Sequence, residues 1–255
     1  MDKPTIVTCY YKISSKRPHD HYVKYIDYFL GNLSSNVNLV LFTSSDMVGF
    51  FNKYTEVKPN IRVVIKEFEQ IPLYIKYLNI WENQYRMDNQ KNTKRTWKCY
   101  VIWNSKINFV TEAIDLNLFG TISNKYVWVD IGCVRDIYHG ELVKNFPNVS
   151  KISENKLDII LLGGEFKNPN QKFFRDEIHF AGAIFGGTDN MFKKFSELYY
   201  KKFDEYLENN QFIGCDQQII SSVYLENKDL FNGIITPLRK INKIDPWFYL
   251  LVYYL

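Results

Sequence analysis

The sequence predicts an α/β fold, with a mostly parallel central sheet and helices on both faces. Two observations carry this prediction. Short apolar runs alternate with longer stretches that carry hydrophobic residues every three or four positions. Several of the short runs are apolar throughout, which is typical of parallel strands that are buried on both faces. No repeat and no Pro/Gly/Ser linker divides the 255 residues, so we expect a single domain over residues 1–255.

Three strands are predicted in the first quarter of the chain, each a short run of β-branched and apolar residues. They are Thr5–Tyr10, residues 37–42 and Ile61–Ile65. A helix over residues 19–30 fits between the first two strands, with Gly31 as its end. The polar cluster at residues 43–46 is expected to cap another short helix.

Longer helices and further strands are predicted in the rest of the chain. One helix carries aromatic and leucine side chains at helical spacing between residues 74 and 85, and another lies within residues 97–118. A long helix begins at Asp189, and a further helix begins near Asp216. Three more strands are predicted at residues 126–130, 157–162 and 180–185.

The order of these elements also predicts where a ligand binds. In a mostly parallel sheet, ligands bind beyond the carboxyl ends of the strands. The residues that follow Tyr10, Phe42 and Val129 are therefore the first candidates for a binding site.

The segment VWVDIGCVRD, residues 127–136, is the most informative of the three strand ends. Asp130 emerges at the end of an apolar strand, where an acid can bind a divalent cation. Gly132 would let a diphosphate approach the backbone, and Arg135 could bind phosphate oxygens through paired hydrogen bonds. In the alternative interpretation, Asp130 and Gly132 only form a turn, and Arg135 pairs with Asp136. The segment alone does not decide between the two.

Small residues gather in the segment HFAGAIFGG, residues 179–187. Ala181 and Gly182 leave room for another group close to the backbone, such as a sugar ring held against main-chain amides. The alternative is tight strand packing followed by a turn. Gly186 and Gly187 taken alone favour that alternative.

An acid and a lysine are two further candidates. Asp216 precedes an apolar helix, and an acid in this position usually caps the helix. In the functional interpretation, Asp216 faces the cleft and takes a proton from an attacking hydroxyl, or holds the acceptor sugar. Lys106, in the segment WNSK, is interpreted as a solvated side chain unless its end of the helix borders the cleft.

The histidine and cysteine spacings argue against a zinc or redox motif. The four histidines show no spacing of the H-E-x-x-H kind, and the four cysteines form no C-x-x-C pair. We therefore expect the cysteines to be small buried residues in a reducing compartment. A nucleophilic Cys133 is not favoured, because no histidine is positioned by sequence to activate it.

Charge and hydropathy exclude several classes of partner. The net charge is +4 with both signs mixed along the chain, whereas nucleic-acid binders usually show a concentrated basic stripe. The basic run at residues 91–98 is interpreted as a solvated loop. No signal-peptide pattern and no apolar stretch of roughly 18 residues is found, so we expect a cytoplasmic protein without a transmembrane segment. The aromatic residues 247–255 are too few to span a bilayer, and we expect them to pack on the core or on a second copy of the chain rather than to bind a membrane surface.

Six segments taken in chain order resemble one family. TIVTCYY, NLVLFTSS, WNSK, YVWVDIGCVRD, FAGAIFGG and GCDQQII are similar to segments of the HtrL/YibB-like (WlaTC/HtrL) family of glycosyltransferase-like proteins. The similarity extends from about residue 5 to residue 231, and the order and spacing of the segments carry it. The resemblance implies a GT-A-like, Rossmann-type nucleotide-diphospho-sugar transferase fold.

The resemblance also implies roles for individual residues. The family pattern W-x-D-x-G falls on Trp128, Asp130 and Gly132, where related GT-A enzymes carry an Asp-x-Asp metal motif. Ser105 and Lys106 would lie near the donor nucleotide. The other positions carried over are Thr8, Tyr10 and Tyr11 beside the nucleotide base, Ala181 and Gly182 beside the donor sugar, and Asp216 and Gln217 at the reacting centre.

The chain departs from the wider GT-A pattern at the metal motif. The second acid of Asp-x-Asp is Gly132 here, and no downstream histidine that could serve as a further ligand follows Gly233. One motif carboxylate therefore remains for a metal ion. Arg135 or Lys106 could take over part of the charge neutralisation.

Together these features predict a glycosyltransferase that moves a sugar from a nucleotide-diphosphate sugar, with a UDP-sugar favoured, to a hydroxyl of a glycan or other acceptor. Asp130 with Mn²⁺ or Mg²⁺ is the first candidate for stabilising the leaving diphosphate, helped by Lys106 and Arg135. Asp216 would be the base in an inverting transfer, or a ligand of the acceptor or donor sugar in a retaining one. The alternative is a non-catalytic carbohydrate- or nucleotide-binding protein on the same scaffold.

Overall fold

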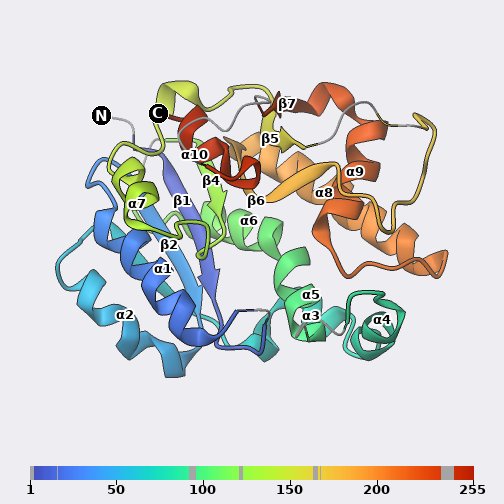
Figure 1. Cartoon of the computed structure of the whole chain (residues 1–255), viewed down its shortest axis with the longest axis horizontal. Helices are drawn as coiled ribbons and strands as arrows, with labels where there is room; N and C mark the ends of the chain where they lie inside the picture. Colours follow the sequence, from blue (N-terminus) through green and yellow to red (C-terminus); the bar gives the residue numbers. More distant parts are fainter. Residues whose placement is uncertain are drawn as a thin grey trace.

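The structure is a computed structural model that describes residues 3–15, 17–91, 96–120, 123–162, 166, 168–236 and 244–255. Within these residues, seven strands form one sheet in the order β3-β2-β1-β4-β6-β5-β7 (Figure 1). The strands are β1 (Thr5–Tyr10), β2 (Asn38–Thr43), β3 (Ile61–Ile65), β4 (Lys125–Val129), β5 (Leu157–Leu161), β6 (Phe180–Thr188) and β7 (Phe231–Ile235). β6 runs antiparallel to β4 and β5, and all other neighbouring strands are parallel. The predicted α/β fold with a mostly parallel sheet is confirmed.

Burial explains why the sequence reveals most of the strands. Every residue of β1, β2, β4 and β6 is buried, so these strands form continuous, largely apolar runs. The predicted bounds agree with β1 and β3 and differ by one residue for β2, β4 and β5. The sequence does not predict β7, or the direction and full length of β6. A strand buried on both faces shows no alternation that marks its direction, and β7 carries Asn232 and Gly233 at its centre.

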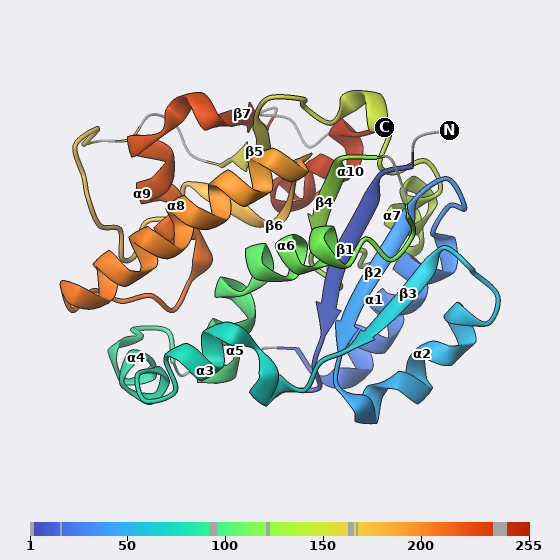
Figure 2. The same cartoon turned by 180° about the vertical axis from the view of Figure 1, so that it is seen from behind.

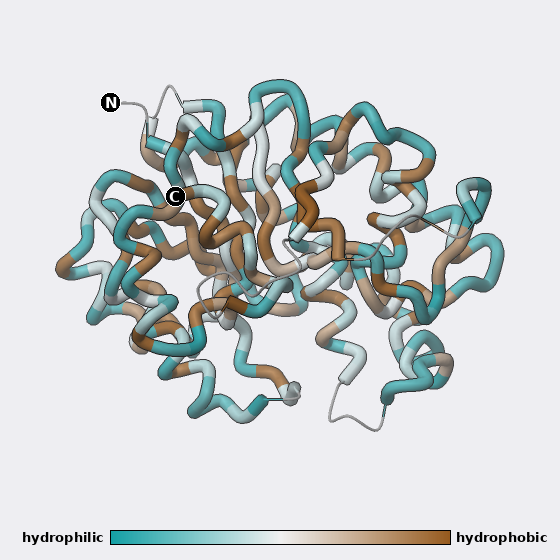
Figure 3. The backbone as a smooth tube through the Cα atoms, turned by 45° about the horizontal axis from the view of Figure 1, so that its top comes forward, coloured by the Kyte–Doolittle hydropathy of each residue, from teal (hydrophilic) through white to brown (hydrophobic). Residues whose placement is uncertain are grey.

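Helices cover both faces of the sheet (Figures 1 and 2). Packed on one face are α1 (His19–Asn32), α2 (Val48–Thr55), α7 (Ile137–Val143) and α10 (Leu250–Tyr253). Packed on the other are α5 (Trp97–Asn104), α6 (Lys106–Leu116), α8 (Asp189–Glu208) and α9 (Asp216–Glu226). The short helices α3 (Pro72–Lys76) and α4 (Trp81–Met87) lie against α5. Hydrophobic residues concentrate in the strands between these layers (Figure 3).

Helix α8 shows how spacing determines packing. Its aromatic side chains recur every three or four residues, which places them on one face of a helix. Five of its six aromatic side chains are buried in the core and Tyr200 is partly buried beside them; the five are Phe192, Phe195, Tyr199, Phe203 and Tyr206. Burial of each such side chain contributes about 1.5–3 kcal/mol, so the apolar face holds this helix in place.

Three predicted helix bounds are wrong. The stretch at residues 74–85 forms two helices, α3 and α4, because the backbone leaves the helical region at Tyr77 (φ −124°, ψ 35°). The helix predicted within residues 97–118 is divided at Ser105 into α5 and α6. Conversely, α1 continues through Gly31 to Asn32. Helical spacing shows which side chains share a face, but not whether the backbone is continuous.

The aromatic C-terminal segment packs on the core, which was one of the two expected outcomes. Leu250, Leu251 and Tyr254 are buried. The hydroxyl of Tyr254 donates a hydrogen bond to Oδ2 of the buried Asp158, at 2.8 Å. This contact ties the end of the chain to β5. Association of two copies through this segment stays a prediction.

The structure also bears on the predictions made for the cysteines, for the basic run at residues 91–98 and for membrane-spanning helices. Cys9, Cys99 and Cys133 are buried, as predicted, and Cys215 is half-buried. Of the basic run at residues 91–98, Lys91 is exposed, while residues 92–95 lie outside the described residues. None of the helices in the described part of the chain combines the length and apolar character that crossing a bilayer requires.

Candidate active site

A cleft opens at the carboxyl ends of β1 and β4, which are neighbours in the sheet. The strand order runs outward from this pair in both directions, so the cleft lies at the topological switch point, where α/β sheets bind ligands. Its volume is ≈ 270 Å³. The walls come from the residues after both strands, the first turns of α1, helix α5 and the C-terminal segment. Two of the three strand ends that were predicted to hold a ligand line this cleft, whereas the residues after Phe42 do not.

Asp130 reaches the cleft because side chains alternate along β4. Trp128 packs on the face covered by α5, α6 and α8, whereas Val127 and Val129 pack on the other face. Asp130 follows in register with Trp128, and the indole Nε1 of Trp128 donates a hydrogen bond to Asp130 Oδ1 at 2.8 Å. The Asp130 side chain is 35% exposed and lines the cleft. A substrate in the cleft can therefore contact this carboxylate.

Lys106 is almost fully buried behind Asp130 and joins three groups. The break at Ser105 makes Lys106 the first residue of α6. Its Nζ lies 3.1 Å from Asp130 Oδ1 and 2.9 Å from Asp216 Oδ2. The same Nζ donates a hydrogen bond to the carbonyl oxygen of Gly182, at 2.7 Å. Lys106 does not itself line the cleft and touches it only through Asp130, so its predicted place near the donor nucleotide stays a prediction.

Asp216 begins α9, and its carboxylate turns toward Lys106. The helix cap that the sequence favours is not formed, because Cys215 takes the cap position. Gly182 makes the close approach possible, since a Cβ on this residue would lie 2.6 Å from Asp216 Oδ2. The Asp216 side chain is 5% exposed and does not line the cleft. Asp130, and not Asp216, is thus the carboxylate within reach of a bound substrate.

Burial and neighbouring charges shift the pKa values of Lys106 and Asp216. Burial by itself would lower the pKa of Lys106, but Asp130 and Asp216 outweigh it and raise the pKa above its ordinary value. The ammonium therefore stays charged. Burial raises the pKa of Asp216, and Asp130 adds to this effect, while Lys106 opposes it.

Arg135 extends along the cleft wall. Its Nε donates a hydrogen bond to the carbonyl oxygen of Gly132 at 3.3 Å, and its guanidinium lies 4.4 Å from the ring centroid of Phe248. The alternative pairing of Arg135 with Asp136 is not formed. Asp136 instead caps α7 by accepting a hydrogen bond from the backbone N–H of His139, at 2.8 Å.

Arg17 is a second arginine in the cleft, and no sequence pattern predicts its place there. Its Nη1 donates a hydrogen bond to the hydroxyl of Tyr25 at 3.1 Å. Arg17 comes from the segment between β1 and α1, far in sequence from Arg135. No local pattern marks such a residue, and only the fold brings it into the cleft.

Of the three residues predicted at the end of β1, two line the cleft and one does not. Tyr10 and Tyr11 line the cleft, as expected for residues beside a nucleotide base. The Tyr10 hydroxyl is hydrogen-bonded to Nδ1 of His19, and the buried Tyr11 hydroxyl has no hydrogen-bond partner in the described part of the chain. Thr8 is fully buried and does not line the cleft.

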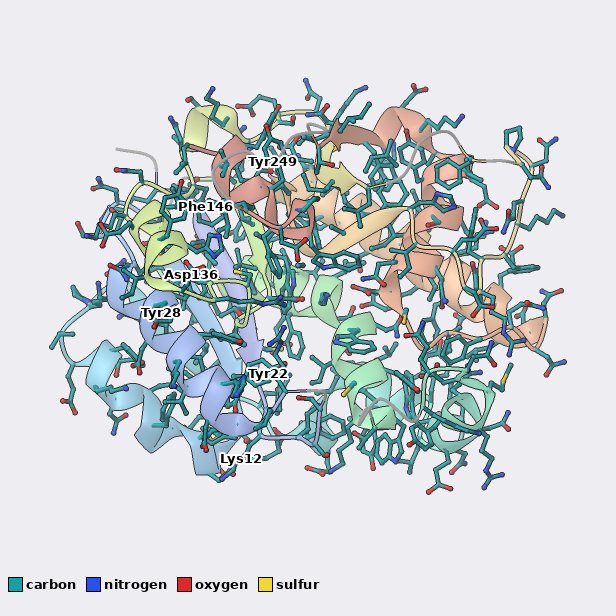
Figure 4. All side chains as sticks on the ribbon, in the orientation of Figure 1. Lys12, Tyr22, Tyr28, Asp136, Phe146 and Tyr249 are labelled. Carbon is teal, nitrogen blue, oxygen red and sulfur yellow. The ribbon has the colours of Figure 1, made fainter. Side chains whose placement is uncertain are left out.

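The space beside Gly132 and beside the small residues of β6 is occupied by other side chains of the protein. A Cβ on Gly132 would lie 2.9 Å from the ring of Tyr22, a side chain of α1 that is labelled in Figure 4. Ala181 is fully buried, and the space beside Gly182 holds the carboxylate of Asp216. Neither Ala181 nor Gly182 lines the cleft, and the contacts of these two residues with a donor sugar stay a prediction.

The side chains do not fit the Mn²⁺ or Mg²⁺ ion that was expected at Asp130. The position between the two carboxylates is filled by the ammonium of Lys106, within 3.1 Å of both. Divalent cations of this kind bind oxygen ligands, and a second positive charge at this distance would repel the ion. In the described residues, no three His, Cys, Asp or Glu side chains gather into a metal site.

A mostly parallel seven-stranded sheet, covered by helices on both faces and with a cleft at its switch point, defines this chain as an α/β protein. More particularly, the chain belongs to the HtrL_YibB family, described as "Bacterial protein of unknown function", whose model matches residues 2–237. No curated protein matches the sequence.

Two solved structures are similar to this chain in backbone arrangement. The apo form of mouse xyloside xylosyltransferase 1 is 11% identical, with a TM-score of 0.47, over 91% of this chain and 85% of that chain. A cytidylyltransferase from Leptospira borgpetersenii serovar Hardjo-bovis (strain JB197) is 12% identical, with a TM-score of 0.45, over 96% of this chain and 79% of that chain.

Proposed function

We propose that this protein is a glycosyltransferase, which moves a sugar from a nucleotide-diphosphate sugar to a hydroxyl group of a glycan or another acceptor. The observation that carries the proposal is the half-buried carboxylate of Asp130 on the wall of the switch-point cleft, oriented by Trp128 and Lys106. Clefts at this position bind nucleotides in many α/β sheets. The aromatic side chains that line the cleft suit a nucleobase and a sugar ring. A UDP-sugar is the first donor to test.

The chemistry requires a base and a group that stabilises the leaving diphosphate. The acceptor oxygen attacks the anomeric carbon, the bond from that carbon to the diphosphate oxygen breaks, and the nucleoside diphosphate leaves with the electron pair. The proton of the acceptor hydroxyl passes to a base. In an inverting transfer Asp130 takes this proton, because it is the carboxylate in the cleft. Asp216 then acts through Lys106 as a positioning residue.

The first prediction concerns Asp130→Asn, which keeps the shape of the side chain and removes its charge. We expect sugar transfer and donor hydrolysis to fall by at least about 100-fold, since a positioned base contributes that much. The measurement is the release of nucleoside diphosphate from a panel of UDP- and GDP-sugars, with and without acceptor. The configuration of the product, inverted or retained, shows whether Asp130 acts as the base or contacts the donor sugar.

The matched control is Asp115→Asn, because the Asp115 side chain is 71% exposed and lies outside the cleft. This variant should turn over at the wild-type rate. Wild-type turnover in Asp130→Asn would overturn the role of Asp130. Binding of donors without turnover on any donor and acceptor tested would favour the alternative, a non-catalytic binding protein.

A further inference from the structure

Arg17 and Arg135 come from separate segments and meet in the same cleft. Both guanidiniums lie near the hydroxyl of Tyr25, which accepts a hydrogen bond from Arg17 and interacts electrostatically with Arg135. Burial and the positive charge of Arg17 together lower the pKa of Arg135. Two positively charged side chains from separate segments therefore line the same cleft.

Neither guanidinium is neutralised by the described part of the chain. Among the described residues, the Arg17 guanidinium donates only to the Tyr25 hydroxyl, and that of Arg135 donates only to the Gly132 carbonyl and lies over the ring of Phe248. Asp245 is close enough to raise the pKa of Arg135 but forms no ion pair with it. Their remaining N–H groups have no partner within the described part of the chain and can bind an anion. A guanidinium offers them in a planar fork that matches two oxygens of a phosphate.

The lysine of the site, Lys106, already forms ion pairs with two carboxylates. Lys106 is shared by Asp130 and Asp216, so its positive charge is already paired and is not available to neutralise a diphosphate. The two arginines supply two further positive charges in the same cleft. The N-terminus of α1 borders it as well, through His19, and adds partial positive charge.

From this arrangement we propose that Arg17 and Arg135 bind the diphosphate of the donor directly and neutralise it as it leaves, in place of a divalent cation. This inference rests on the proposed function for the class of donor, and it explains why the side chains around Asp130 do not fit a metal ion. Guanidiniums that are fixed before the reaction stabilise developing negative charge without reorganisation. The protein should therefore bind a diphosphate in the absence of any metal.

The test is calorimetric titration of the full chain with UDP and with inorganic pyrophosphate, first in excess EDTA and then with Mn²⁺. We expect the dissociation constants in EDTA to lie within about twofold of those in Mn²⁺. Arg17→Gln and Arg135→Gln should each weaken both ligands by roughly tenfold or more, as expected for the loss of a charge-assisted hydrogen bond. Arg86→Gln is the matched control, because Arg86 is 75% exposed and lies outside the cleft, and it should bind as the wild type does.

Arg135 packs on Phe248, so thermal unfolding of each variant is measured alongside, and Arg135→Lys keeps the charge while removing the fork. If Arg135→Lys binds diphosphate as weakly as Arg135→Gln yet remains folded, the fork geometry is confirmed. Three results would overturn the proposal: no binding of pyrophosphate, binding that EDTA abolishes and Mn²⁺ restores, or wild-type affinity in both glutamine variants.

Failure of the arginine proposal can be distinguished from failure of the proposed glycosyltransferase activity. Metal-dependent transfer would retain the glycosyltransferase and reject the arginine pair. Metal-independent diphosphate binding without any sugar transfer would retain the arginine pair and reject the glycosyltransferase.

Discussion

Lys106 lies within 3.1 Å of two carboxylates, and its side chain and that of Asp216 are each only 5% exposed. Removing such charges from water costs several kcal/mol for each ion, and their mutual attraction repays this cost only while all partners are present. The sequence could single out Lys106 only conditionally, because a lysine in a helical stretch is usually solvated. Its importance depends on the distant Asp130 and Asp216, which the fold brings together.

Replacement of Lys106 by methionine should therefore destabilise the protein by about 3 kcal/mol at pH 7.5. The difference in unfolding free energy between this variant and the wild type should become smaller as the pH is lowered. Burial already raises the pKa of Asp216, and without Lys106 it rises further. A carboxyl whose folded pKa exceeds its unfolded value gains stability as the pH falls through the folded pKa. Urea denaturation at pH 7.5 and pH 5 measures both effects.

The control for this variant is Lys53→Met, which removes a surface pair with Asp27 in which both side chains are about half exposed. Its stability should change by less than about 1 kcal/mol at either pH. A Lys106→Met protein as stable as the wild type at pH 7.5 would show that the ammonium of Lys106 does not stabilise the fold.

At the scale of elements, the site depends on where helices begin. The break at Ser105 lets α6 start with Lys106, and α9 starts with Asp216, so both side chains meet beside β6. The sequence predicts the start of α9 from its apolar pattern. It does not predict the break at Ser105, because the segment WNSK contains no Pro or Gly that would mark a helix end.

Two glycine substitutions test how closely these elements pack. Gly182→Ala should destabilise the protein by about 1–3 kcal/mol, because its Cβ would lie 2.6 Å from a buried carboxylate oxygen. Gly31→Ala should instead stabilise it by about 0.5–1 kcal/mol, since Gly31 lies within α1 and a Cβ there meets nothing within 4 Å. Chemical denaturation of both variants gives the two values. Equal stability of the two variants would contradict the packing described for β6 and α9.

At the scale of the whole molecule, the order of the strands determines which segments share the cleft. β1 lies between β2 and β4, so the residues after β1 and the residues after β4 leave the sheet side by side. Asp130 could be predicted here, because it ends an apolar strand. Arg17 and Trp247 could not, because each reaches the cleft from a segment without secondary-structure periodicity, through contacts between parts of the chain far apart in sequence.

The most direct test of the account is a crystal structure of the protein with UDP bound and EDTA present. We expect the diphosphate in the cleft at the ends of β1 and β4, with its oxygens within hydrogen-bond distance of Arg17 and Arg135, and with Asp130 facing the space left for the sugar. UDP bound elsewhere on the protein, or a diphosphate that touches neither arginine and leaves Asp130 without access to the sugar position, would contradict it.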